Sequence, residues 1–415
     1  MSILYELGKA AAEAKYQIQQ LTTVEKNQIL GFVAKGLEED MDFILSQNEK
    51  DMRKGREKGL PEGLMDRLLL TKERILSMAE GIRQVVELPD PVGEILESWS
   101  RPNGLSLEKV RVPMGVIGII YEARPNVTAD AFALAFKTGN VVILKGGTDA
   151  LFSNLAITES IQNSLDKQGV VREAIQLIKD TNRKTTEDFM KLNQYVDVLI
   201  PRGGAGLISM VVKESTIPVI ETGTGNCHIY VDRDANLSMA VSIVVNAKTQ
   251  RIGVCNACES LLVHKEIKER FLPLLAEELE KVHRVELRGD EQVCDLLPQA
   301  IRATEEDYSK EYLDYILSVK VVENVEEAIQ HINRYHTKHS DGIVTENEES
   351  ALRFLNGVDS ACCYWNASTR FTDGFEFGFG AEIGISTQKL HARGPMGLKE
   401  LTTYKYVIRG TGQVR

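Results

Sequence analysis

The sequence predicts an α/β protein with two doubly wound parallel sheets and a small β-hairpin arm. Apolar runs such as GVIGIIY (115–121) and NVVILKGG (140–147) are continuous, which is typical of strands buried on both faces of a parallel sheet. These runs alternate with segments of helical period, and repeated β–α–β order produces a doubly wound sheet. Asn103–Gly104, flanked by apolar residues at strand period, predicts a hairpin with a type I′ turn.

Residues 1–90, before the hairpin, are predicted to be helical. Leu30, Val33 and Leu37 recur at helical spacing, which indicates one amphipathic helix. Pro61 suits the first turn of a later helix, because its fixed φ matches that position and its missing N–H is not needed there.

Two α/β blocks follow the hairpin. The first runs over about 115–226, and one of its helices is predicted at 130–137. The second begins near His228 and includes a long helix over 237–249. The tail is rich in glycine and aromatic residues and ends in a strand-like segment over 402–410.

Composition narrows the functional classes. The chain has 415 residues, of which 43% are hydrophobic and 26% charged, as in a soluble globular protein. The formal net charge of -11 opposes binding to nucleic acid and to anionic membranes, so an anionic ligand would need cations close to its site. The amphipathic start of the chain does not resemble a signal peptide, and no apolar run reaches the roughly 18 residues of a membrane helix.

The six cysteines do not resemble the disulfide framework of a secreted protein. Two of them, Cys362 and Cys363, are adjacent, and the chain is long for a disulfide scaffold. We therefore expect a reducing, cytoplasmic compartment.

Two glycine-rich turns are candidates for nucleotide binding. Lys145-Gly146-Gly147 ends one predicted strand, and the turn from Arg202 through Gly203 and Gly204 ends another and opens a helix. Ligands of doubly wound sheets bind at the carboxyl ends of strands, and free N–H groups at a helix start can contact phosphate. The alternative is that these glycines only make tight turns. A G-x-G-x-x-G motif does not follow the first strand, so an ordinary Rossmann mode is not supported.

Cys255 and Cys258, in RIGVCNACES, admit several interpretations. A structural zinc site needs about four ligands, and only this one pair has suitable spacing, so we expect no metal. A thioredoxin-like couple would begin a helix after a strand, whereas here a helix precedes the pair and a strand follows. The third interpretation is a nucleophilic Cys255 with Cys258 as a small hydrophobe, and the fourth is that both thiols only pack.

The nucleophile interpretation requires a lowered thiol pKa. Moving it from about 8.5 to about 7 needs about 2 kcal/mol, which loop N–H groups and a nearby cation can supply. Gly253 gives the loop conformational freedom, and the N–H groups around Cys255 and Asn256 can converge on a developing oxyanion. We count Asn256 among the substrate-binding candidates for this reason.

Long motifs resemble those of the gamma-glutamyl phosphate reductase family, within the aldehyde dehydrogenase superfamily. The resemblance covers nearly the whole chain. The motifs are GVIGIIYEARPNVTADA, GTGNCHIYVD, KTQRIGVCNACESLLVH, WNASTRFTDGFEFGFGAEIGIST and HARGPMGL.

The resemblance implies NADPH-dependent reduction of L-glutamyl 5-phosphate to L-glutamate 5-semialdehyde, with release of phosphate, in proline biosynthesis. It implies an aldehyde-dehydrogenase-like fold in three parts. We expect a cofactor-binding domain over 1–98 and 114–226, and a catalytic domain over 227–365. An oligomerisation arm and C-terminal segment would comprise 99–113 and 385–415.

The resemblance also assigns residues. The family's nucleophile matches Cys255, and Lys145, followed by Gly146, matches a lysine near the adenosine ribose. The turn at Arg202, Gly203 and Gly204 matches the cofactor-facing turn of the superfamily. Glu311 resembles the glutamate that contacts the nicotinamide ribose.

Other candidates concern the substrate. Asn126 is expected to donate to the oxyanion, as an asparagine does elsewhere in the superfamily. Arg124, Arg370 and Arg393 lie in motif-rich segments and are candidates for binding the anionic substrate. A surface role for any of these arginines is the alternative.

Rival interpretations remain at this point. Glu221 stands where hydrolytic aldehyde dehydrogenases keep a base, so a hydrolytic or CoA-acylating enzyme of the same fold is one alternative. A non-catalytic C-x-x-C binding protein is another. The resemblance implies a homodimer or homotetramer and leaves open a transient contact with glutamate 5-kinase.

Overall fold

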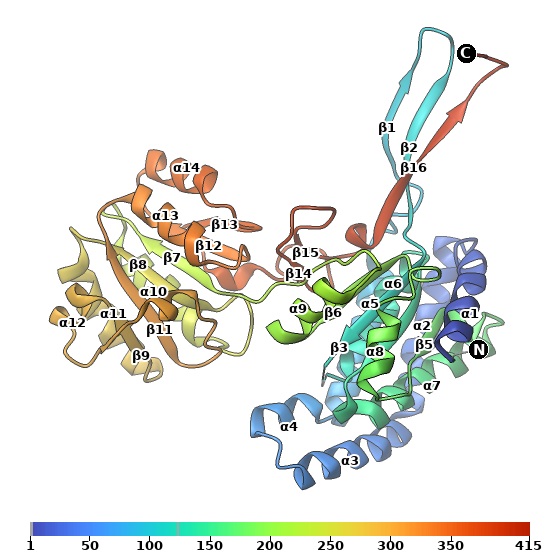
Figure 1. The fold of residues 1–415 in the computed structure, drawn as a ribbon, viewed down its shortest axis with the longest axis horizontal. Helices are drawn as coiled ribbons and strands as arrows, with labels where there is room; N and C mark the ends of the chain where they lie inside the picture. The colour runs from blue at the N-terminus through green and yellow to red at the C-terminus, as the bar shows by residue number, and fades with distance from the viewer. Residues whose placement is uncertain (1–2, 123) are drawn as a thin grey trace. The chain divides into compact units, whose positions relative to one another are not determined.

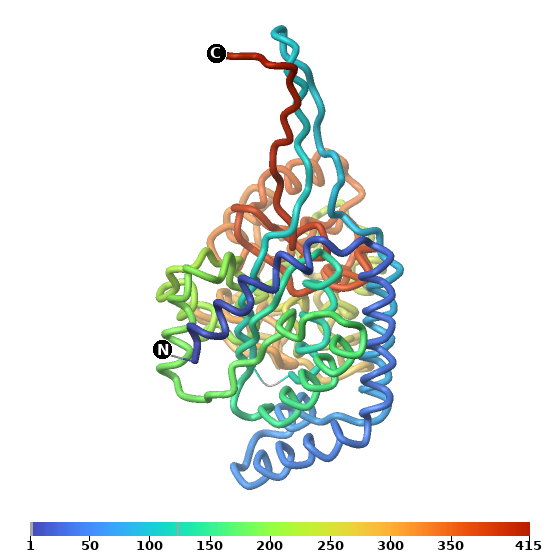
Figure 2. The backbone as a smooth tube through the Cα atoms, turned by 90° about the vertical axis from the view of Figure 1, so that its right-hand side faces the viewer, coloured from blue at the N-terminus to red at the C-terminus, as the bar shows by residue number. Residues whose placement is uncertain are grey.

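The computed structural model describes residues 3–122 and 124–415. The chain forms two compact units. Unit 1 comprises Met1–Glu221, Gly378–Gly384 and Met396–Arg415, and unit 2 comprises Thr222–Phe377 and Ile385–Pro395. Figure 1 and Figure 2 show the course of the chain through both units.

Five helices open unit 1, as the sequence predicts. They are α1 (Ile3–Ile18), α2 (Thr23–Glu39), α3 (Met41–Glu57), α4 (Glu62–Leu68) and α5 (Lys72–Glu87). In α2, the face with Leu30, Val33 and Leu37 is buried, which confirms the predicted period. Pro61 directly precedes α4 as its N-cap residue.

A four-stranded parallel sheet in the order β5-β4-β3-β6 forms the centre of unit 1. Its strands are β3 (Val116–Tyr121), β4 (Val141–Gly146), β5 (Ile175–Leu177) and β6 (Val198–Arg202). The helices between and after them are α6 (Asn126–Lys137), α7 (Leu151–Lys167), α8 (Arg183–Phe189) and α9 (Ala205–Glu214). Every residue of β3, β4 and β5 is buried, as their continuous apolar runs predict.

The arm of unit 1 is a three-stranded antiparallel sheet. Its strands are β1 (Ile95–Ser100), β2 (Ser106–Pro113) and β16 (Thr402–Arg409), with β2 in the centre. The hairpin and the C-terminal strand are therefore confirmed (Figure 1). The predicted type I′ turn is wrong, because Gly104 has φ +91° but Asn103 does not have positive φ. Pro102 explains this result, since it favours the first central position of an ordinary turn, closed here by the bond from Gly104 N to Arg101 O (2.9 Å).

Unit 2 contains a seven-stranded parallel sheet in the order β10-β9-β11-β8-β7-β12-β13. The strands are β7 (Cys227–Val231), β8 (Cys258–His264), β9 (Glu286–Gly289), β10 (Ile301–Arg302), β11 (Ile316–Val322), β12 (Ser340–Val344) and β13 (Cys362–Trp365). The helices are α10 (Leu237–Thr249), α11 (Lys268–Val282), α12 (Glu291–Leu296), α13 (Val325–Tyr335) and α14 (Glu348–Gly357). Separate apolar clusters include α10 and α11 in one case and α13 and α14 in the other, as expected for a doubly wound sheet.

The short pair β14 (Ile385–Ser386) and β15 (Gly394–Pro395) also lies in unit 2. Our sequence-based division instead grouped 385–395 with the arm and ended the first domain at 226. The structure divides the chain at Glu221, because Gly223 N donates to Ile385 O (3.0 Å) and a bridge joins Thr222 to Ser386. Among the described residues, no helix is long and apolar enough to cross a membrane.

Candidate active site

The candidate nucleophile lies in the loop between α10 and β8. α10 ends at Thr249 and β8 begins at Cys258, so Cys255 stands at the amino end of a central strand. Cys255 is partly exposed, whereas Cys258 is fully buried. Burial raises the pKa of the Cys258 thiol to about 12. Of the two thiols, Cys255 is therefore the one that a substrate can reach.

Two residues of the preceding segment hold the main chain of Cys255. A Cβ atom on Gly225 would lie 1.4 Å from the Cys255 carbonyl oxygen, so this close approach requires glycine. The thiol of Cys227, at the start of β7, donates to the same oxygen at 3.1 Å. Burial raises the pKa of Cys227 well above its ordinary value, so this thiol keeps its proton. Together they fix the backbone that carries the nucleophile.

Asn256, the next residue, is buried and binds the segment that contains Arg370. Its side-chain amide donates to Thr372 O at 2.8 Å and to Arg370 O at 3.3 Å. Its Oδ1 accepts from the Arg370 guanidinium, and Thr369 Oγ1 donates to the Asn256 carbonyl at 2.8 Å. The Asn256 side chain thus already has protein partners at both ends, and it positions Arg370.

Arg370 is a cation coupled to the nucleophile loop. Its Nε donates to Gln250 Oε1 at 3.0 Å. Burial lowers the pKa of Arg370, and nearby Arg251 lowers it further, while Asp373 and then the thiols of Cys255 and Cys227 act in the opposite direction. Arg370 is therefore electrostatically coupled to the thiol of Cys255.

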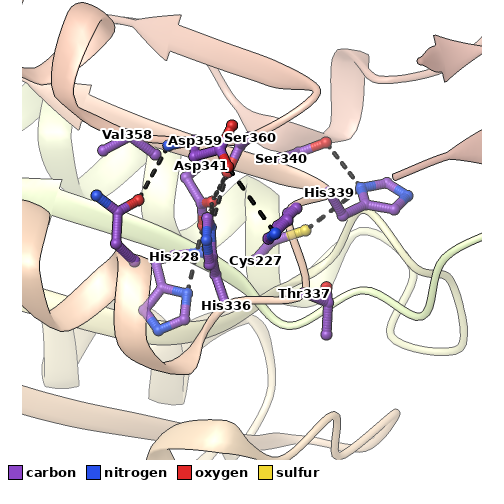
Figure 3. A network of polar contacts seen from close by, with 12 residues as sticks. Cys227, His228, His336, Thr337, His339, Ser340, Asp341, Val358, Asp359 and Ser360 are labelled. Carbon is purple, nitrogen blue, oxygen red and sulfur yellow. Dashed lines mark hydrogen bonds and ion pairs between the residues drawn. The ribbon is translucent and has the colours of Figure 1, made fainter. Parts of the chain in front are cut away.

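A buried polar network continues below this loop (Figure 3). His339 Nδ1 lies 3.7 Å from Cys227 Sγ and 2.8 Å from Ser340 Oγ. Ser340 Oγ lies 2.6 Å from Thr372 Oγ1, and Thr372 O accepts from Asn256. The network therefore connects the support of Cys255 to the partner of Asn256.

Asp341 is the charged centre of the same network (Figure 3). It accepts from His228 N at 2.7 Å and lies 2.9 Å from His336 Nδ1, and Ser360 Oγ also donates to it. Burial alone would raise the pKa of Asp341, but hydrogen bonds from His228 and His336 hold it well below its ordinary value. A buried carboxylate with these donors stays ionised.

Glu311 contacts Gly225, which supports the main chain of Cys255. Its Oε1 accepts from Gly225 N at 2.7 Å. Burial raises the pKa of Glu311, while this bond opposes the rise. The structure thus brings together three sequence-predicted residues of unit 2, namely Cys255, Asn256 and Arg370, and joins Glu311 to them through Gly225.

Arg393 is held elsewhere in unit 2. Its Nη2 donates to both the carbonyl and the carboxylate of Asp359 at 2.9 Å. Lys389 also pairs with Asp359, at 2.9 Å. These contacts hold Arg393 against Asp359, and its substrate-binding role stays a prediction.

The remaining candidates lie in unit 1, at the carboxyl edge of its sheet. Tyr121, the last residue of β3, pairs with Gly146 on one side and Arg202 on the other. The turns at Lys145–Gly146 and Arg202–Gly204 therefore end β4 and β6, the strands on either side of β3. The sequence predicted that each turn ends a strand. Asn126 begins α6 at this edge and donates to Asp130 Oδ2 at 3.0 Å.

Lys145 is a buried cation at this edge. Its Nζ donates to Gly146 O at 3.2 Å, and burial lowers its pKa while Asp180 opposes the fall. An ammonium group has three donor protons, so Lys145 can still donate to a ligand. A Cβ atom on Gly146 would lie 2.3 Å from Asn154 Nδ2, so the turn is also closely packed.

Sequence reasoning missed Glu122. Its Oε2 accepts from Gly204 N at 3.0 Å, so a protein carboxylate binds the start of α9. A Cβ atom on Gly203 would lie 2.7 Å from the same carboxyl group. The available signal was its place in YEARPN, directly after β3, where the parallel sheet brings it beside the Gly203–Gly204 turn.

Comparison with known proteins agrees with this architecture. A family model described as "Aldehyde dehydrogenase family" matches residues 5–301. The chain belongs to the aldehyde dehydrogenase family.

The relatives narrow the class further. Gamma-glutamyl phosphate reductase of Caldanaerobacter subterraneus subsp. tengcongensis is 58% identical over 408 residues, which cover 98% of each chain. The enzyme of that name from Enterococcus faecalis is 56% identical over 412 residues and 99% of each chain. The crystal structure of gamma-glutamyl phosphate reductase from Thermotoga maritima is 50% identical, with a TM-score of 0.98 over 100% of both chains. The chain is therefore an oxidoreductase of the gamma-glutamyl phosphate reductase branch of this family.

More distant structures share the fold alone. An acetylating aldehyde dehydrogenase from Geobacillus thermoglucosidasius is 17% identical, with a TM-score of 0.70 over 99% of this chain and 97% of that one. The predicted aldehyde-dehydrogenase-like fold is thus confirmed.

Proposed function

We propose that this chain reduces L-glutamyl 5-phosphate to L-glutamate 5-semialdehyde with release of phosphate, using NADPH, as a step of proline biosynthesis. The names of its relatives, which are 54–58% identical over nearly their whole length, support the substrate. The observation that carries the mechanism is the partly exposed Cys255, held at its carbonyl by Gly225 and Cys227 and coupled to Arg370.

Cys255 acts as the nucleophile. Its thiolate attacks the acyl carbon, so a carbon–sulfur bond forms and the carbon–oxygen bond to phosphate breaks. Phosphate is a good leaving group, so no strong general acid is required. When bound, the nicotinamide cofactor supplies the hydride that reduces the resulting thioester. The tetrahedral oxyanion then collapses to the aldehyde and returns the electron pair to the Cys255 sulfur.

Arg370 binds the anionic substrate in this proposal. Its guanidinium is oriented by Asn256 and Gln250 and partly buried, which strengthens its interaction with an anion. Arg124 is a second candidate cation, and Asn126 a candidate donor to the oxyanion. The rigid backbone around Cys255 and Asn256 offers N–H groups for the same oxyanion.

The residues of unit 1 fit a nicotinamide cofactor. Lys145 retains donor protons at the carboxyl edge of the parallel sheet, where such ligands bind. We assign Lys145 and Gly146 to the adenosine ribose and the turn of Arg202, Gly203 and Gly204 to the neighbouring part of the cofactor. Glu122 already binds Gly204 N, so that N–H group is not free for the cofactor. We therefore expect Lys145 to contribute more to cofactor binding than the turn at Arg202–Gly204. In unit 2, Glu311 would hold the nicotinamide ribose.

The arm supports a homo-oligomer. Tyr404, Tyr406 and Ile408 of β16 are each at least half exposed, and neighbouring exposed apolar residues mark interaction surfaces. We propose a homodimer or homotetramer assembled through this sheet. A cytoplasmic location fits the six cysteines, which form no disulfide in the described structure.

The reverse reaction tests the proposal. We expect oxidation of glutamate 5-semialdehyde with NADP to require inorganic phosphate, since phosphate must release the acyl group from Cys255. Rapid oxidation without phosphate or coenzyme A would instead indicate a hydrolytic dehydrogenase. Mass spectrometry of quenched enzyme should find the glutamyl group on the peptide containing Cys255; an adduct on another peptide would contradict the mechanism.

A further inference from the structure

A buried ion pair joins α10 to β8, the two elements that flank the nucleophile loop. It has no part in the reaction described above. Lys248, in the last turn of α10, and Glu259, the second residue of β8, are both fully buried, and Lys248 Nζ lies 2.5 Å from Glu259 Oε2. Removing two charges from water is unfavourable unless both find partners. A pair at this position therefore calls for an explanation beyond packing.

The second carboxylate oxygen of Glu259 explains the position of this ion pair, because it binds another segment of the chain. Oε1 accepts from the backbone N–H of Leu313 at 3.1 Å. Leu313 has φ +53°, which a residue with a side chain adopts unfavourably, and its own side chain is 41% exposed. The bond to Glu259 stabilises the backbone at this residue.

Leu313 belongs to the segment that carries Glu311. Residues 310–315 contain no helix or strand and lie between a 3₁₀ turn ending at Ser309 and β11. The hydroxyl of Tyr312 donates a 2.8 Å hydrogen bond to Asp307 Oδ1, which joins this segment to the preceding 3₁₀ turn. The bond from Leu313 N to Glu259 instead joins residues 310–315 to β8, the strand that follows Cys255.

Both contacts of the segment 310–315 lead to the residues around Cys255. Glu311 accepts from Gly225 N, and Gly225 packs against the carbonyl of Cys255. Glu259 stands four residues after Cys255, so a single rigid connection runs from β8 through Leu313 and Glu311 back to the thiol loop. Each Glu311 oxygen has more than one lone pair, so the bond to Gly225 still leaves acceptors for a ribose hydroxyl.

We propose that Glu259, held by Lys248, is a positioning residue that sets Glu311 relative to Cys255 and thereby tunes binding of the nicotinamide cofactor. The inference rests on the proposed cofactor role of Glu311. Lys248 orients the Glu259 carboxylate, and Leu313 transmits its position.

Two double variants isolate the hydrogen bond from the ion pair. Lys248→Met with Glu259→Gln removes both charges but keeps an acceptor for Leu313 N–H, whereas Lys248→Met with Glu259→Leu removes the acceptor as well. We expect the NADPH dissociation constant, measured by fluorescence titration, to be about tenfold higher in the second variant than in the first, as for loss of one partly buried hydrogen bond. Equal affinities in the two variants would overturn the proposal.

Hydrogen exchange separates this proposal from the cofactor role of Glu311. Amides of 310–315 should exchange faster in the Glu259→Leu double variant than in the Glu259→Gln one, with no cofactor present. Equal protection would again overturn the positioning role. Glu311→Gln tests the assigned contact alone: unchanged NADPH affinity in that variant would reject the cofactor role of Glu311, whatever the exchange result.

A third variant covers the case in which the Glu259→Leu protein does not fold. Glu259→Asp keeps the charge for Lys248 but shortens the side chain, so it cannot span both Lys248 and Leu313. We expect weaker NADPH binding and an unchanged KM for the acyl phosphate. An equal rise in both constants would indicate general disruption and contradict positioning.

Discussion

The thiol of Cys227 donates a hydrogen bond of 3.1 Å to the carbonyl oxygen of Cys255, so one cysteine supports the backbone of another. The supporting thiol is fully buried and stays protonated, whereas the supported residue is partly exposed. The two cysteines differ in environment, and they should differ in chemistry.

We expect Cys227→Ala to lower kcat about fivefold, because loss of one hydrogen bond of roughly 1 kcal/mol loosens the backbone at Cys255. Cys227→Ser keeps a donor and should lose less. Steady-state kinetics of both variants measure the difference. Full activity of Cys227→Ala would show that the bond has no role in catalysis.

Replacing the nucleophile has a different signature. Cys255→Ser should abolish semialdehyde formation while leaving NADPH binding intact, since a serine hydroxyl is a far weaker nucleophile than a thiolate. Cys258→Ser is the matched control, because its thiol is buried and its pKa is raised, and it should keep most of the activity. Phosphate release by the Cys255→Ser enzyme at a normal rate would disprove covalent catalysis.

Gly225→Ala should be severely damaging. The added Cβ atom would lie 1.4 Å from the Cys255 carbonyl oxygen, so the thiol loop must move, and we expect a loss of more than about 2 kcal/mol in the free energy of unfolding, together with most activity. Gly31→Ala, where the added Cβ meets nothing within 4 Å in α2, should instead be neutral or slightly stabilising. Urea denaturation with activity assays compares them.

Stability should fall in mild acid. Burial lowers the pKa of His331 to about 3 and of His339 to about 4, from about 6.5 in the unfolded chain. The unfolded state therefore binds more protons below pH 6.5, and stability is lost progressively as the pH falls from about 6.5 towards 4, by on the order of 2 kcal/mol per histidine.

His331→Phe provides the control for that pH dependence. Its ring lies against Tyr308 and Tyr335, so phenylalanine can fill the space without titrating. Thermal unfolding between pH 7 and pH 5 should show a smaller fall in Tm for this variant than for the original chain. An identical slope would show that His331 makes no contribution.

Periodicity predicted the layers of this protein well, because it reports local burial. The helix predicted over 237–249 spans Leu237–Thr249, and the runs at 115–121 and 140–147 contain β3 and β4. The hairpin was predicted correctly and its turn type was not, since Pro102 overrides the preference of Asn103–Gly104.

The site was predicted less completely because its supports are long-range. The bond from Cys227 to Cys255 spans 28 residues, and that from Glu259 to Leu313 spans 54. No local pattern marks such pairs. The sequence likewise could not show that Asp359 binds Arg393, or that Glu122 contacts Gly204, since both depend on tertiary packing.

The hydrogen bonds of Asn256 to the segment 369–372 have a consequence for biosynthesis of the chain. The hydrogen bond from the Asn256 side-chain amide to Thr372 O joins residues 116 positions apart. During translation, the reactive cysteine emerges long before the segment that completes its surroundings. A nascent chain therefore carries a thiol loop without these contacts until the segment around Thr372 has left the ribosome.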